Sequence, residues 1–561
     1  MPNSKIDRSK THKTTMNASL LIPLYVDEYF PGDTVNLSVS ALVRKLTPIV
    51  PTIDDESIKF FAFSVRCKSI WNGTKSFFGE NQSTAWTNQA NEVYPAGNHL
   101  VYSSDDHPEM DGVTESMIGA YMGLPTHWNG QTSFTLTHVT RLQVGGYCMI
   151  WNEFFRNQNV TAPLSINKDV CLFQQGSSII DSNSQPFRVT KLADYFTSCL
   201  PSPQKGDAVS LPVQLQGLLP MVTQNAMTAT GAPGLKLGNT GTAIADNSTL
   251  GVSAAAANDG GAVHAYTDTL SSGNAGGTIN MTNLYADSSH ATGTSVDINQ
   301  LRYAIATQRI FEKDARGGTR YREVIKSHFG VSLNQLEDDI AEFLGEFSQP
   351  VHSTQQTNTD SNLGMVGASS TTATSGNLIN KTFSEWGYVY VLACIRKKAT
   401  YSQGIPRQFM RSERLDFYHP SLAHIGEQPV YVKELYAVPT DGSSSLDARL
   451  GVGDVFGYQE AWAEHRYSPN QISGQLSVGH SSHPLIPWTY QENYDAPPVL
   501  NDSWMQDNTL ECVDKTIKLP SITYGNTTVQ HSHQYLVDTY ISSIWTRTMP
   551  VHSIPGLMDH F

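Results

Sequence analysis

Four segments of the chain have the spacing of apolar residues that is typical of β-strands. Residues 33–43 alternate between polar and apolar positions, and the apolar members are Val35, Leu37, Val39, Ala41 and Val43. This alternation predicts a strand with one buried face, and residues 535–545 repeat it. Residues 58–67 and 386–395 are apolar at almost every position, so we expect central strands that are covered on both faces.

Helices are few in this sequence. Residues 298–316 follow a capping-box pattern at Asp297 and Gln300. Their same-face stripe consists of Ile298, Leu301, Ile305 and Gln308. A second short helix is predicted over residues 319–329, with Gly330 as its C-terminal cap. A third is predicted over residues 142–155, where Gly145 and Gly146 lower the helical propensity.

The order of these elements favours one β body with very long connections. The strands lie tens to hundreds of residues apart, and the sequence has no repeat of fixed period and no alternation of strands with helices. We therefore expect residues 1–561 to form a single antiparallel barrel or sandwich. A low-complexity tract at residues 349–381 is interpreted as part of one of the long connections.

Residues 222–297 form the most unusual segment of the chain. They consist mainly of Gly, Ala, Ser, Thr and Asn, and they contain no Phe, Trp, Cys, Glu or Arg. Such a segment has little apolar area with which to offset the entropy of ordering. We interpret residues 222–297 as a surface insertion, because connections of this length inside a compact protein are usually functional or disordered.

The charge of the chain makes it a poor candidate for wrapping nucleic acid unaided. Only 16% of the 561 residues are charged, and the formal net charge is −14, whereas binding of phosphates needs Lys and Arg. The first 16 residues are a local exception because they carry one acid, Asp7, against Lys5, Arg8, Lys10 and Lys13. We predict that residues 1–16 form a basic N-terminal arm.

The cysteines and the apolar runs indicate the cellular compartment in which the chain folds. The six cysteines are scattered without a CxxC pair, which favours buried free thiols and a reducing compartment. The N-terminal residues lack the apolar stretch of a secretory signal. The longest wholly apolar run, near residues 388–395, is far shorter than the roughly 20 residues of a membrane-spanning helix.

Most catalytic motifs are missing from the sequence, and we predict no catalytic, cofactor-binding or metal-binding residue. His531 and His533 lack an identifiable third ligand. Glu460 and Glu464 are four residues apart, as the paired acids of a glycosidase could be, although a solvated face is the commoner reason for such spacing. Two alternatives to a structural protein stay open: a β-sandwich carbohydrate-active enzyme and a ligand-binding module.

The C-terminal residues 547–561 combine two prolines and a glycine with apolar side chains. We expect an extended arm that packs along its own body or along a neighbouring subunit. The apolar residues of this arm are Met549, Val551, Ile554, Leu557 and Phe561.

Several phrases, in order from the first residues to the last, resemble one protein family. They include IPLYVDEYFPGDT, FFGENQSTAW, EKDARGGTRYREVIKSHFGV, SQGIPRQFMRSERLDFYHPSLAHIGEQPV, VFGYQEAWAEHRYSP and RTMPVHSIPGLMDHF. Together they resemble the major capsid proteins of the microviruses, which are small tailless icosahedral bacteriophages with single-stranded DNA. The gokushovirus branch is the most similar.

The resemblance implies a mainly β fold, namely an eight-stranded antiparallel jelly-roll barrel with very long loop insertions and a few short helices. It implies a non-enzymatic protein of the virion, assembled in the bacterial host cytoplasm as about sixty copies in a T=1 shell around circular single-stranded DNA. Residues 222–297 would project outward and serve host attachment, and Lys5, Arg8, Lys10 and Lys13 would face the DNA.

The resemblance also implies several partners. They are identical capsid subunits, a small basic DNA-binding virion protein, a DNA pilot protein, an internal scaffolding protein, the packaged single-stranded DNA and a host-cell surface receptor.

Overall fold

The body of the protein consists of a six-stranded and a four-stranded antiparallel sheet. The computed structural model describes residues 3–80, 117–125, 139–209, 298–357, 366–439, 445–478, 485–518 and 533–552, with only the backbone of short strands between 214 and 295 and between 521 and 530. The chain divides into two compact units. One consists of Met1–Lys205 with Glu312–Phe561, and the other is Gly206–Phe311.

The first sheet contains both segments that were predicted to alternate. Its strand order is β2 (Lys10–Met16), β27 (Tyr535–Arg547), β4 (Thr34–Lys45) and β19 (Val366–Thr382). Strand β1 (Ser4–Asp7) also pairs with β27, and β18 (Ser353–Thr357) pairs with the far side of β19. The alternation of β4 is confirmed, because the predicted residues Val35, Leu37, Val39, Ala41 and Val43 are buried and the residues between them are half-buried or exposed.

The second sheet contains the two segments that were predicted to be covered on both faces. Its strand order is β3 (Ile22–Tyr29), β20 (Gly387–Lys397), β5 (Glu56–Arg66) and β17 (Glu342–Pro350). Strands β5 and β20 are central, and nearly all their residues are buried. The prediction of central strands is therefore confirmed.

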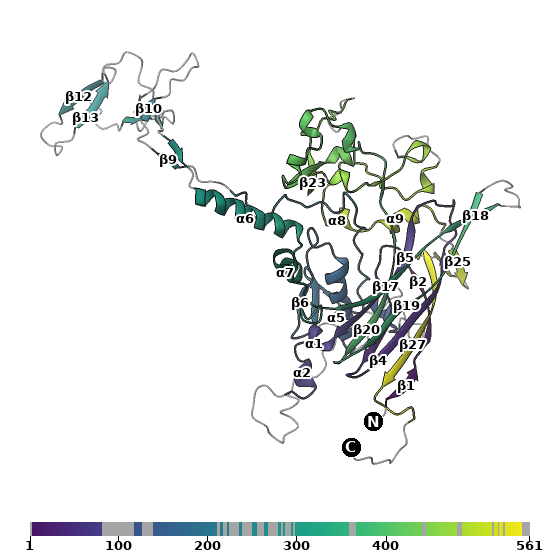
Figure 1. The fold of residues 1–561 in the computed structure, drawn as a ribbon. Coiled ribbons are helices and arrows are strands. Elements are labelled where there is room, and N and C mark those ends of the chain that lie inside the picture. The colour runs from purple at the N-terminus through teal and green to yellow at the C-terminus, as the bar shows by residue number, and fades with distance from the viewer. Residues whose placement is uncertain are drawn as a thin grey trace. The chain divides into compact units, whose positions relative to one another are not determined.

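The connectivity of the eight strands is that of a jelly roll. Numbered along the chain from β2 to β27, they lie in the order 1-8-3-6 in the first sheet and 2-7-4-5 in the second. Every pairing within these two sheets is antiparallel. The mainly β fold with long insertions and few short helices is thus confirmed, and Figure 1 shows the two sheets crossing the centre of the view.

The main core lies between the two sheets. Strand β4 contributes its alternating residues, β5 contributes Phe60 and Ala62, and β27 contributes Tyr535 and Trp545. Tyr29 stacks on Phe383 with 3.9 Å between ring centroids, which closes one end of this core. Burial of these large side chains is the main source of stability of the sandwich.

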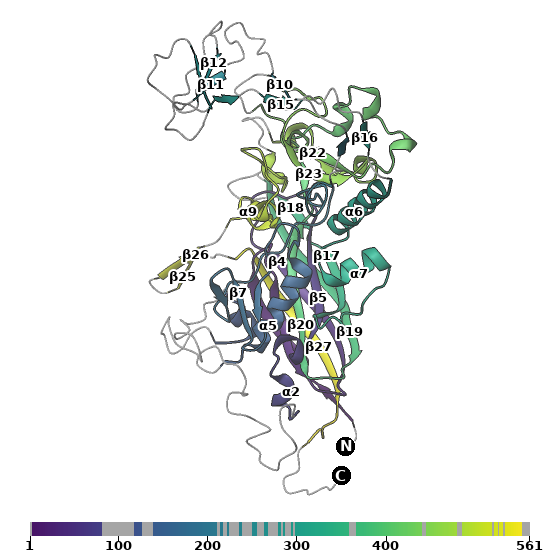
Figure 2. The same cartoon turned by 90° about the vertical axis from the view of Figure 1, so that its left-hand side faces the viewer.

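A second core covers the far face of the second sheet. It packs Phe61, Phe63 and Val65 of β5 against α5 (Leu142–Ile150) and the π-helical turn Trp151–Phe155 that continues it. In Figure 2, α5 lies over the central strands. The other elements of this layer are α1 (Cys67–Ile70), α2 (Thr74–Phe77), α4 (Ile118–Met122), β6 (Ser165–Asn167), β7 (Leu172–Gln175) and β8 (Ser178–Ile180).

A third core packs the connection between β20 and β27 against residues 195–199 of the connection between β5 and β17. It consists of side chains such as Phe196, Tyr401, Leu435, Phe456 and Trp504. The elements of the connection between β20 and β27 are β21 (Thr400–Tyr401), β22 (Glu427–Tyr431), β23 (Val455–Glu460), β24 (Asn470–Gln471), α8 (Asp502–Met505), α9 (Thr509–Asp514), β25 (Ser521–Tyr524) and β26 (Thr527–Gln530). The 3₁₀ turns in it are Arg407–Phe409, Arg414–Asp416, Pro420–Leu422, Val432–Glu434, Ala463–His465, Gly474–Leu476 and Ile486–Trp488.

The interpretation of residues 349–381 as a connection is wrong. Most of this tract forms β18 and β19; residues 371–382 of β19 pair with β4, and residues 366–370 pair with β18. Small residues replace the usual large apolar ones: Ala368, Ser370 and Thr372 are buried, and the hydroxyl oxygens of Ser40 and Ser375 lie 2.9 Å apart across the two strands. Thr supports a strand because it is β-branched.

The three predicted helices are confirmed. Helix α6 is Ile298–Arg316, α7 is Tyr321–Phe329, and Gly330 follows α7 in the left-handed conformation with a φ of 72°. Asp297 of the predicted capping box lies outside the described residues. Within the described residues no helix is both long and apolar enough to span a membrane.

Short strands in the second unit pair in a nested order. The pairs are β9 (Gln214–Gln216) with β16 (Gly293–Ser295), β10 (Met221–Thr223) with β15 (Leu284–Ala286), β11 (Leu235–Leu237) with β14 (Ile279–Met281), and β12 (Leu250–Ala254) with β13 (Val263–Thr267). The chain therefore leaves and returns along one antiparallel path.

Candidate functional site

The four cations of the N-terminal segment lie on strands at the edge of the first sheet. Lys5, Arg8, Lys10 and Lys13 are all exposed, and residues 4–16 pair with β27. Lys5 and Lys13 are on the outward side of the strands, opposite Thr546 and Asp538. The structure thus places the predicted cations on an ordered sheet edge.

The side chains of Arg8 and Lys10 contact the second sheet, whereas those of Lys5 and Lys13 are on the outward side of the first sheet. Arg8 forms an ion pair with Asp27 at 3.0 Å, and the Nζ of Lys10 lies 4.7 Å from the ring centroid of Tyr25. Both partners belong to β3 of the second sheet. The structure therefore separates the four cations into two pairs, of which Arg8 and Lys10 already engage side chains of this chain.

The outward side of the first sheet holds two further residues that the sequence analysis missed. Arg44 of β4 and Tyr540 of β27 are exposed on it, close in register to Lys13. We call this surface, formed by the outward side chains of β2, β27, β4 and β19, the open sheet face. Its alternation was visible in the sequence, because Arg44 follows Val43 on the polar phase of the predicted strand.

The predicted C-terminal arm begins immediately after an anchored arginine. The Nε of Arg547 lies 3.0 Å from Asp33, and its guanidinium donates to the backbone oxygen of Glu28 at 2.6 Å. Beyond it, Met549 and Val551 are 41% and 62% exposed. The remaining residues of the predicted arm, Ile554, Leu557 and Phe561, lie outside the described residues.

Helices α6 and α7 expose apolar side chains. In α6, Ile298, Leu301 and Ile305 of the predicted stripe are all exposed, and Ala315 is its one buried residue. In α7, the first residue, Tyr321, is 69% exposed, and the last, Phe329, is 79% exposed. Exposed apolar residues in such numbers are typical of interaction surfaces.

The acids that suggested a glycosidase do not form a pair. Glu460 ends β23 and forms an ion pair with Arg466, whereas Glu464 lies in a 3₁₀ turn and accepts from Arg411 at 3.1 Å. Trp462 between them has a φ of 66°, so the segment is not helical.

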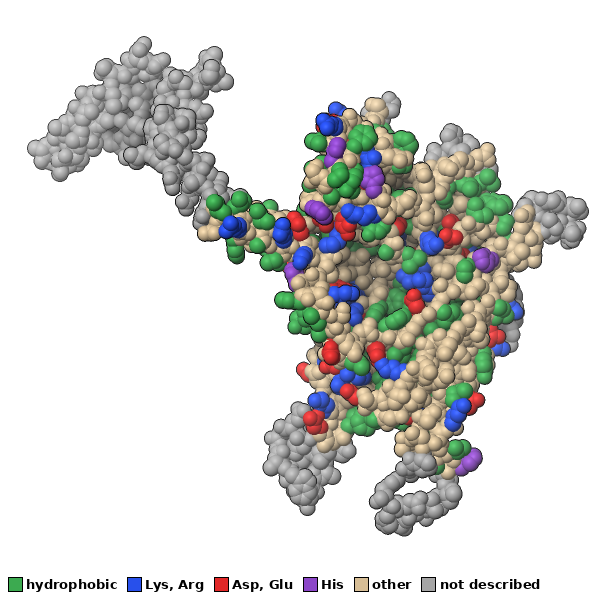
Figure 3. Space-filling model, viewed as in Figure 1, with side chains coloured by type: hydrophobic (Ala, Val, Ile, Leu, Met, Phe, Trp, Pro, Cys, Tyr) green, Lys and Arg blue, Asp and Glu red, His purple; other side chains and the backbone are tan. Residues whose placement is uncertain are grey.

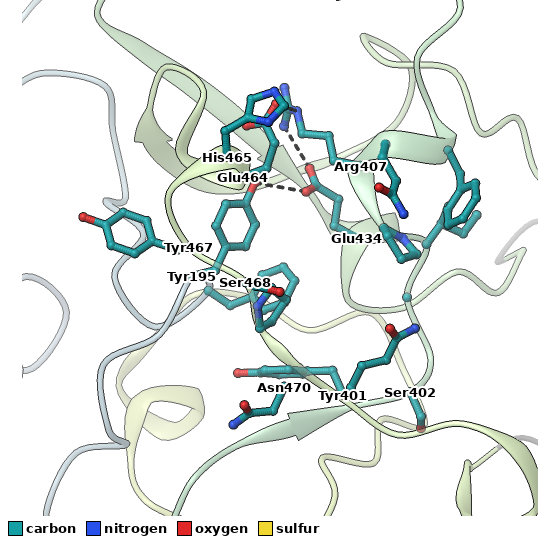
Figure 4. A pocket seen from close by; sticks show the side chains of 18 of the residues that line it. Tyr195, Tyr401, Ser402, Arg407, Glu434, Glu464, His465, Tyr467, Ser468 and Asn470 are labelled. Carbon is teal, nitrogen blue, oxygen red and sulfur yellow. Dashed lines mark hydrogen bonds and ion pairs between the residues drawn. The ribbon is translucent and has the colours of Figure 1, made fainter. Parts of the chain in front are cut away.

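A cavity of about 460 Å³ places Glu464 near another acid, Glu434 (Figure 4). Burial raises the pKa of Glu434 against the opposing charge of Arg407. For Glu464, burial is outweighed by the hydrogen bond from Gln428 and by the nearby arginines, so its pKa is lowered. Separated pKa values are a feature of acid–base pairs in enzymes.

Arg407 argues against hydrolysis in this cavity. Its guanidinium lies 3.1 Å from Glu434 and 3.7 Å from Glu464, so it engages both carboxylates. A glycosidase needs the space between its carboxylates for the sugar and a water molecule. The arrangement is that of a structural ion-pair network, which ties the turn Arg407–Phe409 to the third core.

The other candidate chemistry is also accounted for in the described part of the chain. His533 is buried and hydrogen-bonds to the hydroxyl of Thr15, while His531 lies outside the described residues. All six cysteines are free, as predicted; five are buried, and Cys512 is half-buried. Burial raises the pKa of Cys67 to about 12, which keeps this thiol protonated and unreactive.

Comparison with known proteins agrees with this fold over the whole chain. The model of the family described as "Capsid protein (F protein)" matches residues 1–557. Capsid protein VP1 of Spiroplasma virus 4 is 34% identical, and the alignment covers 99% of this chain and 96% of that protein.

Two further relatives carry the same name. Capsid protein VP1 of Chlamydia phage 1 is 31% identical over 99% of this chain and 95% of its own length. Capsid protein VP1 of Bdellovibrio phage phiMH2K is 31% identical, and the alignment covers 90% of this chain and 88% of that protein. With its jelly roll and its match along the full length, this chain belongs to the F-type capsid proteins of the microvirus-like single-stranded DNA bacteriophages.

Proposed function

We propose that this capsid protein builds a T=1 icosahedral shell of about sixty copies around a circular single-stranded DNA genome. The observation that carries the proposal is the eight-stranded jelly roll together with a family match that spans residues 1–557. Self-assembly with identical subunits follows from the family, and the long connections supply area for contacts between subunits. Exposed apolar residues on α6 and α7 support such contacts.

We propose that residues 222–297 form a protrusion on the exterior of the shell that serves host attachment. The composition of this segment supports a role outside the core, and its nested strand pairs support a single out-and-back excursion. The excursion lies in the chain between β5 and β17, two strands of the second sheet. A receptor on the host-cell surface is its proposed partner.

The other proposed partners lie inside the shell or act during assembly. They are the packaged DNA, a small basic DNA-binding virion protein, a DNA pilot protein and an internal scaffolding protein. Because the chain has a net charge of −14, a separate basic protein is needed to neutralise the genome. Free buried thiols support assembly in the reducing bacterial cytoplasm.

We propose that residues 547–561 form an arm that packs against a neighbouring subunit. Arg547 fixes the start of this arm through Asp33 and Glu28. The exposure of Met549 and Val551 supports burial by another copy.

Electron microscopy of particles formed by the expressed chain tests the shell. We expect closed particles with icosahedral symmetry and density for residues 222–297 on the outside. A variant in which these residues are replaced by a short Gly–Ser linker should still form shells and should no longer bind host cells. Soluble monomers under all conditions, or an insertion that faces inward, would contradict the proposal.

The same expressed chain distinguishes a structural role from a hydrolase. Glu464→Gln should leave any glycoside hydrolysis at the background level of the unaltered chain, because Arg407 occupies the gap between the carboxylates. Hydrolysis by the unaltered chain that disappears in this variant would favour the carbohydrate-active enzyme instead.

A further inference from the structure

The open sheet face presents its side chains in regular rows. One row runs from Thr15 through Leu536 to Arg44, and the next runs from Lys13 through Asp538 to Leu42. A third row contains Thr11, Tyr540 and Ser40. Successive rows are about 7 Å apart, since each step spans two residues of an antiparallel strand.

Two cations on this face lack partners. Neither the ammonium of Lys13 nor the guanidinium of Arg44 forms an ion pair or a hydrogen bond with the part of the chain that the structure describes. They flank β27 from its two sides and line a shallow groove of about 550 Å³ together with Leu42, Leu536 and Asp538. Asp538, which lies opposite Lys13 in the same groove, offsets one of these charges, so the groove keeps a net positive charge that can attract an anion.

An aromatic ring lies one row away from Lys13 and two rows away from Arg44. Tyr540 is 50% exposed and follows Asp538 by two residues on the same side of β27. Leu536, on the other side of Asp538, is 40% exposed. An exposed aromatic ring beside cations is the combination by which proteins bind single-stranded nucleic acid, because bases stack on the ring while phosphates contact Lys and Arg.

The rest of the open sheet face is polar and almost uncharged. Its outward residues on β4 and β19 include Asn36, Ser40, Ser375, Asn377 and Asn380. In Figure 3 this area appears as a broad band without acidic or basic side chains. Hydroxyl and amide groups can donate to phosphate and sugar oxygens without selecting a sequence. No described helix covers this face, in contrast to the second sheet, which the second core covers.

We propose that the open sheet face binds single-stranded DNA without sequence preference, with phosphates at Lys13 and Arg44 and a base stacked on Tyr540. The inference rests on the proposed shell function and deepens it. It selects Lys13 from the four N-terminal cations, adds Arg44 and Tyr540, and leaves out Arg8 and Lys10. Those two engage Asp27 and Tyr25, so they have less charge to offer a phosphate.

Binding of a fluorescein-labelled oligothymidylate to the full-length, unassembled chain tests the proposal. We expect the double variant Lys13→Gln/Arg44→Gln to weaken binding about tenfold or more at low salt. The slope of log K against log salt concentration should become shallower by about 1.4, because each phosphate contact with a single strand contributes about 0.7. The matched control Lys515→Gln/Lys518→Gln removes two exposed cations near α9 and should leave the slope unchanged.

Tyr540 is tested separately. Tyr540→Ala should weaken binding about tenfold without a change of slope, whereas Tyr540→Trp should retain binding because it retains a stacking surface. All these side chains are exposed, so the variants should keep the unfolding transition of the unaltered chain. Failure of the unaltered chain to bind the probe, or equal slopes for the Lys13/Arg44 variant and its control, would overturn the inference.

Shell formation and DNA content of the Lys13/Arg44 variant distinguish failure of the DNA-binding face from failure of the proposed shell function. If the Lys13/Arg44 variant forms normal shells with less DNA, both are supported. If it forms normal shells with unchanged DNA, the DNA-binding face is wrong while the shell stands. If it fails to form shells although the chain is folded, the open sheet face is an interface with a second copy, which also overturns the inference.

Discussion

At the scale of single residues, a buried charged cluster joins the third core to the second sheet. Glu492 lies 2.9 Å from Lys191 and 2.9 Å from Lys397, and all three side chains are at most 5% exposed. Asn508 donates to the same carboxylate at 3.0 Å. Because charges lose their hydration when they are buried, each member depends on the others.

Replacement of Glu492 should therefore be strongly destabilising. Glu492→Gln leaves two buried lysines without their carboxylate, so we expect a loss of about 3–5 kcal/mol in the free energy of unfolding. The matched control is Glu460→Gln, which breaks an exposed ion pair with Arg466 and should cost less than about 1 kcal/mol. Urea unfolding of the full-length chain measures both. Equal midpoints for the two variants would contradict the assignment.

The same cluster predicts that the stability of the folded chain depends on pH in the acidic range. Burial opposes ionisation of Glu492, but Lys397 and Lys191 outweigh it and lower its pKa from 4.5 to about 2. Since the folded-state pKa is lower than the unfolded one, the stabilisation is complete above about pH 4.5 and is lost as the pH falls towards 2. The urea midpoint of the unaltered chain should fall in this range. Glu492→Gln should show a smaller fall, and parallel pH profiles would exclude Glu492 as the source.

Gly146 permits close contact between α5 and β20. A Cβ atom at this position would lie 2.7 Å from Cζ of Tyr390, whose hydroxyl donates to the backbone oxygen of Gln143 at 2.8 Å. We expect Gly146→Ala to cost about 1–3 kcal/mol through overpacking, despite the better helical propensity of Ala. The control Gln143→Ala in the same helix should be nearly neutral. Partial recovery in Gly146→Ala/Tyr390→Phe would identify the hydroxyl as the clashing group.

In the sequence alone, Gly145 and Gly146 indicate only a lower helical propensity. The helix over residues 142–155 is present, but Gly146 permits contact with a strand more than two hundred residues away in the sequence, and Gly145 faces Ile70 and Phe173. Local patterns report the face that an element buries, and they do not report which element approaches it. Contacts of this kind could not be predicted from the sequence alone.

At the scale of elements, the strands that sequence analysis predicted are those with large apolar residues. Strands β4, β5, β20 and β27 have these residues at the spacing of a strand. Strand β19 was missed because its buried positions before Leu378 carry Ala, Ser and Thr, which give no hydrophobic signal, and Leu378 and Ile379 are adjacent instead of alternating. The candidate site lies on the outward, polar side of the predicted strands. Arg44 and Tyr540 could be recognised as part of it only from the register of β2, β27 and β4, which places them near Lys13.

The N-terminal strands give a prediction at this scale. Removal of residues 3–9 deletes β1 alone, and we expect the sandwich to stay folded because β2 still covers most of β27. Removal of residues 3–16 also deletes the fully buried Met16 and leaves the edge of β27 unpaired. We expect that longer deletion to aggregate, since an unpaired edge strand associates with other chains. Static light scattering and unfolding of both truncated chains measure the difference, and two well-folded monomers would show that residues 10–16 are dispensable.

At the scale of the whole molecule, the order of eight strands could not be read from the alternation of apolar residues. Residue patterns led to a β body with a surface excursion, and the jelly roll entered through resemblance to a family. Among the side chains that the structure describes, all members of the three cores belong to residues 1–205 and 312–561. Of the second unit, Gly206–Phe311, the structure describes the side chains of residues 206–209 and 298–311, and none of these belongs to a core.

This separation predicts that the first unit folds without the second. A Cβ atom on Gly206 would lie 3.6 Å from the ring of Phe311, so the two ends of the excision lie close together. Replacement of residues 206–311 by a short Gly–Ser linker should leave stability within about 2 kcal/mol of the full chain, in the stabilising direction, because closing a shorter loop costs less entropy. All nine tryptophans lie outside residues 206–311, so tryptophan fluorescence follows the same unit in both chains. A matched replacement of residues 403–500, which removes part of the third core, should abolish the cooperative transition. Loss of that transition in the 206–311 variant as well would show that the excursion is needed for folding of the jelly roll.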